Sequence, residues 1–122
     1  MQPKNNRSKI LIIDDDPVFQ IVAERDTKAN RKQVIVPHTP DELDQVDLRD
    51  VGMVICDRHL CGRWAAVAEN VLDTVYGSIP IVEMTADMGD NKRNQQTVRT
   101  YRKNIDNIGD IVGAWLRERK II

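Results

Sequence analysis

The chain has 122 residues, of which 41% are hydrophobic and 30% charged, and its 18 basic and 19 acidic residues leave a net charge of -1. These values are typical of one globular domain and argue against disorder or a general affinity for nucleic acid or membranes. There is no apolar leader, no apolar stretch of membrane-spanning length and only two cysteines. We therefore expect a protein of the reducing cytoplasm.

The polar segment 1–8 is expected to be a flexible arm, followed by one domain over 9–122. Short apolar runs rich in β-branched residues then predict strands: KILIID (9–14), VIV (34–36), VGMVIC (51–56), IPIVEM (79–84) and, less clearly, a run around TYRK (100–103). Runs that are continuously apolar, rather than alternating, are typical of parallel strands that are covered on both faces.

Helical patterns fill the gaps between these runs. A helix is expected to begin at Pro17, with Val18, Ile21, Val22 and Ala29 near one face. TPDE (39–42) predicts a capping box on Thr39, and apolar positions at helical spacing predict helices over 64–75 and 108–116, whereas 89–99 is polar and predicts at most a weak helix. Strands that alternate with helices predict a (βα)5 fold, a doubly wound parallel sheet.

Function in such sheets collects beyond the carboxyl ends of the strands. Polar side chains follow four of the five runs there: Asp14 to Asp16, Asp57, Thr85 and Lys103. Taken singly, each has a structural explanation, as a helix cap, a turn former, a strand-end cap or a solvated lysine. Together, at the ends of separate strands, they predict one site.

The chemistry of these residue types explains why they belong together. Clustered carboxylates repel one another and require a cation, and hard oxygen ligands suit Mg²⁺. A carboxylate such as Asp57 can act as a nucleophile toward phosphorus, and Thr85 and Lys103 could neutralise or contact the phosphoryl oxygens. The sequence therefore indicates phosphoryl transfer to an aspartate.

The segments ILIIDDDP, VICDRHL, IPIVEMTA and YRKN, in this order, resemble the receiver domain of bacterial two-component response regulators. The resemblance covers nearly the whole chain. It implies a flavodoxin-like receiver domain over 9–122 with a five-stranded sheet in the order 2-1-3-4-5. It also implies a phosphorelay signalling domain, rather than an enzyme, that catalyses only its own phosphorylation and dephosphorylation.

The resemblance also implies a role for each matching residue. Asp57 would be the phosphoacceptor, with Thr85 and Lys103 as the switch hydroxyl and the catalytic lysine. Asp14, Asp15, Asp57 and the backbone carbonyl of His59 would bind Mg²⁺. The partners implied are a sensor histidine kinase or phosphotransfer protein, and a downstream effector protein or an output domain. Direct binding to nucleic acid or membranes is not expected.

The chain departs from the family pattern around the fourth helix and the fifth strand. The segment from Thr85 to Lys103 is shorter than usual, and Thr100 stands where the family has its switch aromatic, with Tyr101 one position later. These departures favour one alternative function, a pseudo-receiver that binds proteins without being phosphorylated.

Two further alternatives remain open on the sequence. Cys56, His59 and Cys61 could begin a metal site, or the cysteines could form a redox pair, although Cys56 is expected to face the core as a small hydrophobic residue. The spacing of Asp14 and Asp16 also matches the D-x-D motif of haloacid-dehalogenase-type phosphatases, in which Asp14 rather than Asp57 would be labelled.

Overall fold

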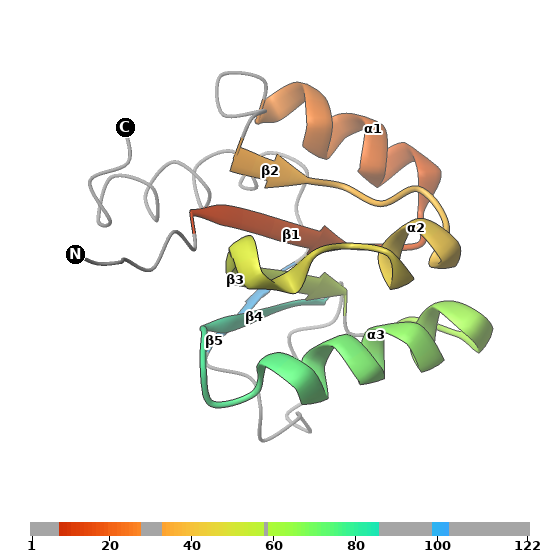
Figure 1. Cartoon of the computed structure of the whole chain (residues 1–122). Helices are drawn as coiled ribbons and strands as arrows, with labels where there is room; N and C mark the ends of the chain where they lie inside the picture. The colour runs from red at the N-terminus through yellow and green to blue at the C-terminus, as the bar shows by residue number, and fades with distance from the viewer. Residues whose placement is uncertain (1–7, 28–32, 58, 86–98, 103–122) are drawn as a thin grey trace.

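The computed structural model describes residues 8–27, 33–57, 59–85 and 99–102. Within them, five strands form one sheet in the order β2-β1-β3-β4-β5, and every neighbouring pair is parallel (Figure 1). The strands are β1 (Lys9–Ile13), β2 (Val34–Ile35), β3 (Val51–Asp57), β4 (Ile81–Thr85) and β5 (Arg99–Arg102). The predicted doubly wound sheet and its strand order are confirmed.

The described part of the chain also contains three α-helices and a short 3-10 helix before β3. They are α1 (Pro17–Asp26), α2 (Pro40–Asp44), η2 (Leu48–Asp50) and α3 (Gly62–Val75). The proposed arm up to residue 7, the pattern over 108–116, most of 89–99 and Lys103 lie outside the described residues.

The core lies in two layers on opposite faces of the sheet. On one face, Phe19 and Ala23 of α1 pack on side chains of the central strands such as Ile12 and Ile55. On the other face, Leu43 of α2 and four residues of α3 pack on the alternate side chains of the same strands. Helices cover both faces of the sheet (Figure 1), in keeping with the mostly apolar sequences of the central strands β1 and β3.

Helix α1 buries a different stripe from the one expected. Val18 and Ile21 are 62% and 61% exposed, whereas Phe19, Val22 and Ala23 are buried. Positions 19, 22 and 23 have the i, i+3, i+4 spacing of one helix face, so the sole phenylalanine of the chain directs the helix onto the sheet. Of the apolar face expected from the sequence, Val22 lies in the core, Val18 and Ile21 are exposed, and Ala29 lies outside the described residues.

The predicted cap of α2 is confirmed, with one change. The Thr39 hydroxyl accepts a hydrogen bond from Glu42 N at 3.1 Å, as an N-cap should. The carboxylate of Glu42 accepts from His38 N at 2.8 Å, one residue before the position that a capping box would use. Asp41 of α2 forms an ion pair with Arg63 of α3, which ties the two helices together.

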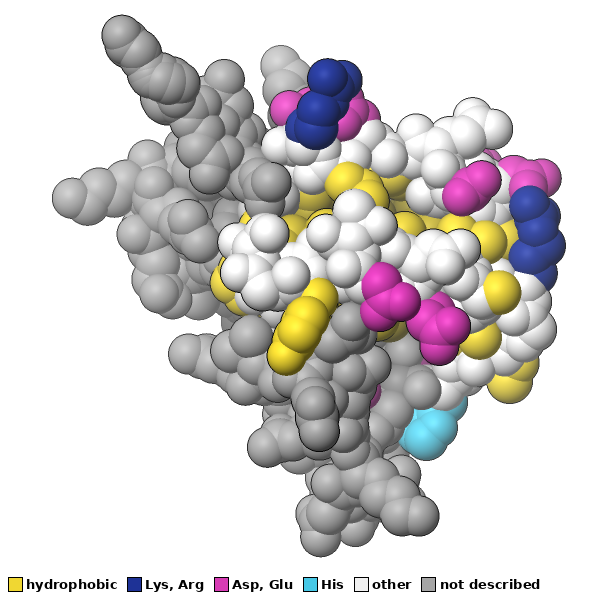
Figure 2. All heavy atoms as spheres, turned by 60° about the horizontal axis from the view of Figure 1, so that its bottom comes forward, with side chains coloured by type: hydrophobic (Ala, Val, Ile, Leu, Met, Phe, Trp, Pro, Cys, Tyr) yellow, Lys and Arg dark blue, Asp and Glu magenta, His cyan; other side chains and the backbone are white. Residues whose placement is uncertain are grey.

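Charges on the described surface are mixed rather than gathered by sign. Figure 2 shows dark blue basic side chains next to magenta acidic ones, in keeping with the ion pairs Arg49–Asp47 and Arg63–Asp41. Among the described helices, none has both the length and the apolar character needed to cross a membrane.

Two isoleucines allow a matched test of the two-layer core. Ile12 is 1% exposed in β1, and Ile21 is 61% exposed on α1. We expect Ile12→Ala to lower the free energy of unfolding by about 2–5 kcal/mol through lost burial and a cavity. Ile21→Ala should change it by no more than about 0.5 kcal/mol, as measured by urea denaturation. Equal losses in the two variants would contradict this placement of α1.

Candidate functional site

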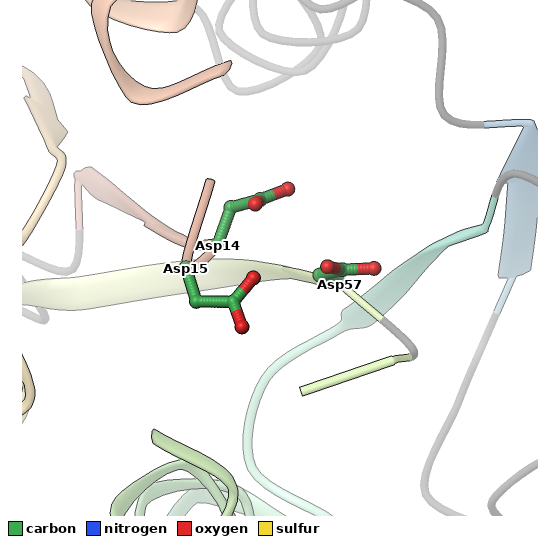
Figure 3. Close-up of side chains that lie close together, drawn as sticks. All are labelled: Asp14, Asp15 and Asp57. Carbon is green, nitrogen blue, oxygen red and sulfur yellow. The ribbon is translucent and has the colours of Figure 1, made fainter. Parts of the chain in front are cut away.

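Three carboxylates meet beyond the carboxyl ends of the two central strands. Asp14 and Asp15 follow β1 directly, and Asp57 is the last residue of β3. One oxygen from each carboxylate lies within 4.8 Å of the others, and the three side chains gather around one small space (Figure 3). Asp14 and Asp57 are buried and Asp15 is half-buried. The structure therefore brings together the three aspartates that the sequence predicted as neighbours.

The register of the sheet produces this convergence. Ile13 of β1 lies opposite Cys56 of β3 in a parallel pair, so the next residue of each strand, Asp14 and Asp57, emerges at the same edge. Because the flanking runs are apolar on both faces, a shift of register would expose core side chains to water. The core thus fixes the position of the acids.

The turn after β1 is held by hydrogen bonds to its own acids. Oδ1 of Asp14 accepts from Asp16 N at 2.9 Å. Oδ1 of Asp16 in turn accepts from Val18 N at 2.9 Å and caps α1, with Pro17 in the first turn. Asp16 is exposed and is not part of the carboxylate cluster. The third acid of the run therefore begins a helix, while the first two form the site.

The cluster has the donors that a hard divalent cation requires. Two carboxylate charges about 4.8 Å apart repel by roughly 3.5 kcal/mol at an effective dielectric near 20. Burial of Asp14 and Asp57 limits the screening of this repulsion by water. Oxygen ligands with room for water and phosphate oxygens suit Mg²⁺ better than softer metals. Asp14, Asp15 and Asp57 could therefore hold Mg²⁺.

His59 contacts the site through its backbone. Its N–H donates to Oδ1 of Asp57 at 3.2 Å, and its side chain is exposed. This bond orients the carboxylate that the sequence identifies as the phosphoacceptor. The predicted role of the His59 carbonyl as a metal ligand stays a prediction.

The backbone of β4 brings one more predicted position, Thr85, to this edge. Asp57 lies opposite Met84, so Thr85, the last residue of β4, follows one position beyond. Thr85 in turn lies opposite Arg102, the last residue of β5. Lys103 comes next in the sequence and lies outside the described residues. The roles of Thr85 and Lys103 stay predictions.

The two cysteines lie in different environments, and neither belongs to the carboxylate cluster. Cys56 is buried in the core as expected, and its Sγ donates to Asp57 O at 3.3 Å. Burial above all, and then the negative charges of Asp57 and Glu83, raise the pKa of the Cys56 thiol. Cys61 is exposed at the start of α3.

Nothing in this arrangement favours a zinc site or a redox pair. Within the described ranges, the group of three or more His, Cys, Asp or Glu side chains that could bind one metal ion consists of the three aspartates alone. Zinc would require further close ligands for Cys56 or Cys61.

Sequence reasoning missed two buried polar residues near the site. Gln20 is on α1 and Glu83 on β4, opposite Cys56, and they are 4% and 8% exposed. The signal for Glu83 was its position as the lone acid in the apolar run 79–84. Gln20 had no comparable signal, because the wrong face of α1 had been assigned to the core.

The comparisons with known proteins identify the fold. No family model and no curated protein sequence matches the chain. Among solved structures, a Thermotoga maritima response regulator, TrrA, in complex with Mg²⁺-BeF, is 15% identical with a TM-score of 0.66, over 91% of this chain and 97% of that one. A signal receiver domain of an HD domain-containing protein from Pseudomonas fluorescens is 16% identical with a TM-score of 0.64, over 93% and 96%.

These similar structures are mostly receiver domains of response regulators, so the chain has the receiver fold. A designed protein with a Rossmann 2x3 fold also matches, with 16% identity and a TM-score of 0.61 over 91% of this chain and 90% of that one. A designed protein shows that the backbone alone does not determine function. The function must therefore be argued from the carboxylates.

Metal binding to the cluster should stabilise the fold, because a cation relieves the repulsion between the acids. Mg²⁺ at about 100 times its dissociation constant is expected to add roughly 2.7 kcal/mol to the free energy of unfolding. Thermal denaturation with and without Mg²⁺ measures this gain, and Asp14→Asn, which removes one ligand charge, should reduce it. A melting temperature of the wild type that is indifferent to millimolar Mg²⁺ would contradict the site.

The different environments of the two thiols predict a clear difference in reactivity. In the folded protein we expect Cys61 to react with Ellman's reagent at the rate of a free thiol. Cys56 should react only on unfolding, because it is buried and held in the unreactive thiol form. The control Cys61→Ser should show no fast-reacting thiol. Two fast-reacting thiols in the wild type would contradict the burial of Cys56.

Proposed function

We propose that the chain is a phosphoacceptor receiver domain that takes a phosphoryl group on Asp57 with the help of Mg²⁺. One observation carries this proposal: Asp57, at the end of β3, shares a space with Asp14 and Asp15 from the end of β1. Three carboxylates in that arrangement suit a metal that neutralises an incoming phosphoryl group, with one carboxylate available as the nucleophile.

In the proposed reaction, a carboxylate oxygen of Asp57 attacks the phosphorus of the donor. The new O–P bond forms as the bond from phosphorus to the donor's histidine nitrogen breaks, and the departing imidazole retains the electron pair. Bound Mg²⁺ would supply positive charge to the phosphoryl oxygens. The N–H of His59 holds Oδ1 of Asp57, which restricts how the carboxylate turns toward the donor.

Lys103 is proposed to act during this transfer, and Thr85 after it. The Lys103 ammonium would neutralise phosphoryl charge, and the Thr85 hydroxyl would bind a phosphoryl oxygen and so couple phosphorylation to a change in the adjoining surface. Thr85 lies opposite Arg102, the residue that precedes Lys103 in the sequence. This register supports the proposed roles of Thr85 and Lys103. On this proposal, the chain catalyses only its own phosphorylation and dephosphorylation.

The proposed partners are a histidine kinase or phosphotransfer protein in the cytoplasm, and an effector protein or output domain downstream. The exposed Val18 and Ile21 support a protein partner, because they lie in the helix that begins beside Asp14 and Asp15. A phosphohistidine donor must bring its ring to Asp57, and apolar side chains nearby can provide contact area for it.

The geometry weakens the alternative phosphatase. That function would need Asp16 as a partner of Asp14 and would leave Asp57 without a role. Instead, Asp16 caps α1 outside the cluster and Asp57 lies within it. An experiment distinguishes the pseudo-receiver alternative from the proposed function, because a pseudo-receiver is not phosphorylated on Asp57.

Incubation with acetyl phosphate and Mg²⁺ should add the mass of one phosphoryl group to the chain. Asp57→Asn is expected to abolish this gain, because an amide is not a nucleophile toward phosphorus. The matched control is Asp16→Asn, which makes the same change in the acidic run and keeps a good N-cap. The measurement is intact-protein mass spectrometry, followed by mapping of the labelled residue.

The location of the label distinguishes the functions. A phosphoryl group on Asp57 supports the receiver. A label on Asp14 would support the phosphatase, and the absence of any label from the folded wild type would support the pseudo-receiver.

A further inference from the structure

Gln20 is a polar residue in the core layer formed by α1. Its side chain is 4% exposed, and its neighbours Phe19 and Ala23 belong to the hydrophobic core. Burying an amide is unfavourable unless its hydrogen bonds are replaced. Here Nε2 of Gln20 donates to the backbone oxygen of Asp14 at 2.7 Å. The amide in the core therefore binds the backbone of a candidate metal ligand.

A second bond from the same residue reaches the other side of the turn. The backbone N–H of Gln20 donates to Asp16 O at 3.0 Å, and Asp16 N donates to Oδ1 of Asp14 at 2.9 Å. Gln20 thus binds the Asp14–Asp15 peptide unit through its side chain and the Asp16–Pro17 unit through its backbone, while the Asp15–Asp16 unit is bound by the carboxylate of Asp14. Asp14 and Asp15 cannot change their backbone direction without breaking a buried hydrogen bond.

We propose that Gln20 is a positioning residue that sets the metal affinity of the site. It holds the Asp14 peptide so that the carboxylates of Asp14 and Asp15 are aligned with Asp57 before the metal arrives. This inference rests on the proposed function, since it takes the cluster to be a Mg²⁺ site. Residues that orient metal ligands typically change metal affinity about 10- to 100-fold when they are replaced.

The test is Gln20→Met in the full chain, which keeps the length of the side chain and removes its donor. We expect the dissociation constant for Mg²⁺, measured by titration calorimetry, to rise about 10-fold or more. The rate of labelling by acetyl phosphate should fall at low Mg²⁺ and recover at saturating Mg²⁺, because Asp57 itself is intact. A general loss of stability is distinguished from this effect by a control variant that is destabilised away from the acids.

Thr27→Val is the matched control. Thr27, the C-cap residue of α1, is also buried and donates from Oγ1 to Ala23 O at 2.6 Å, but it lies at the opposite end of the helix from the acids. This variant should lose stability while its dissociation constant for Mg²⁺ stays within about twofold of the wild type. If Gln20→Met does not fold, Gln20→Asn, whose amide is one methylene shorter, replaces it with the same expectation.

Two results would overturn the inference alone: a wild type that binds Mg²⁺ no more tightly than Gln20→Met, or an equal weakening in Gln20→Met and Thr27→Val. A wild type that bound no Mg²⁺ at all would overturn the proposed function together with this inference.

Discussion

The repulsion among three carboxylates at one edge of the sheet is the interaction around which the described structure is arranged. Parallel pairing of β1 and β3 forces Asp14 and Asp57 to emerge side by side, and the buried strands prevent them from separating. The fold accepts an unfavourable charge cluster at the place where a bound cation would relieve the repulsion. The same feature therefore limits stability and supplies the proposed function.

Hydrogen bonds near the cluster restrict how the acids can relax. Asp14 is bound through its side chain by Asp16 N and through its backbone by Gln20, while Asp57 accepts from His59 N. Each of these bonds holds part of an aspartate in place. A site prepared in this way loses less entropy on binding than one whose ligands must first be ordered.

Sequence reasoning was accurate where one strong local rule applied. Continuous apolar runs predicted β1 to β4, whereas β5 was only weakly marked, and Thr39 was correctly assigned as a cap because its hydroxyl has a defined bond to make. It was wrong on α1, where Val18 and Ile21 have the same periodicity as a core face. Periodicity alone could not rank two apolar stripes on one short helix, and the larger Phe19 determined the packing. Gln20 was missed for the same reason, since its bond to Asp14 depends on which stripe faces inward.

The candidate site was predictable because it depends on topology more than on side-chain detail. Once the strand order is known, the residues after β1 and at the end of β3 must be neighbours, whatever their identity. Their identity then decides the chemistry: carboxylates at these positions are ligands that Mg²⁺ prefers, and Asp57 is the proposed phosphoacceptor. The fold provides the edge where residues 14, 15 and 57 meet, and the carboxylates provide the chemistry. Neither the backbone similarity nor the acidic motif is therefore sufficient by itself to assign a function.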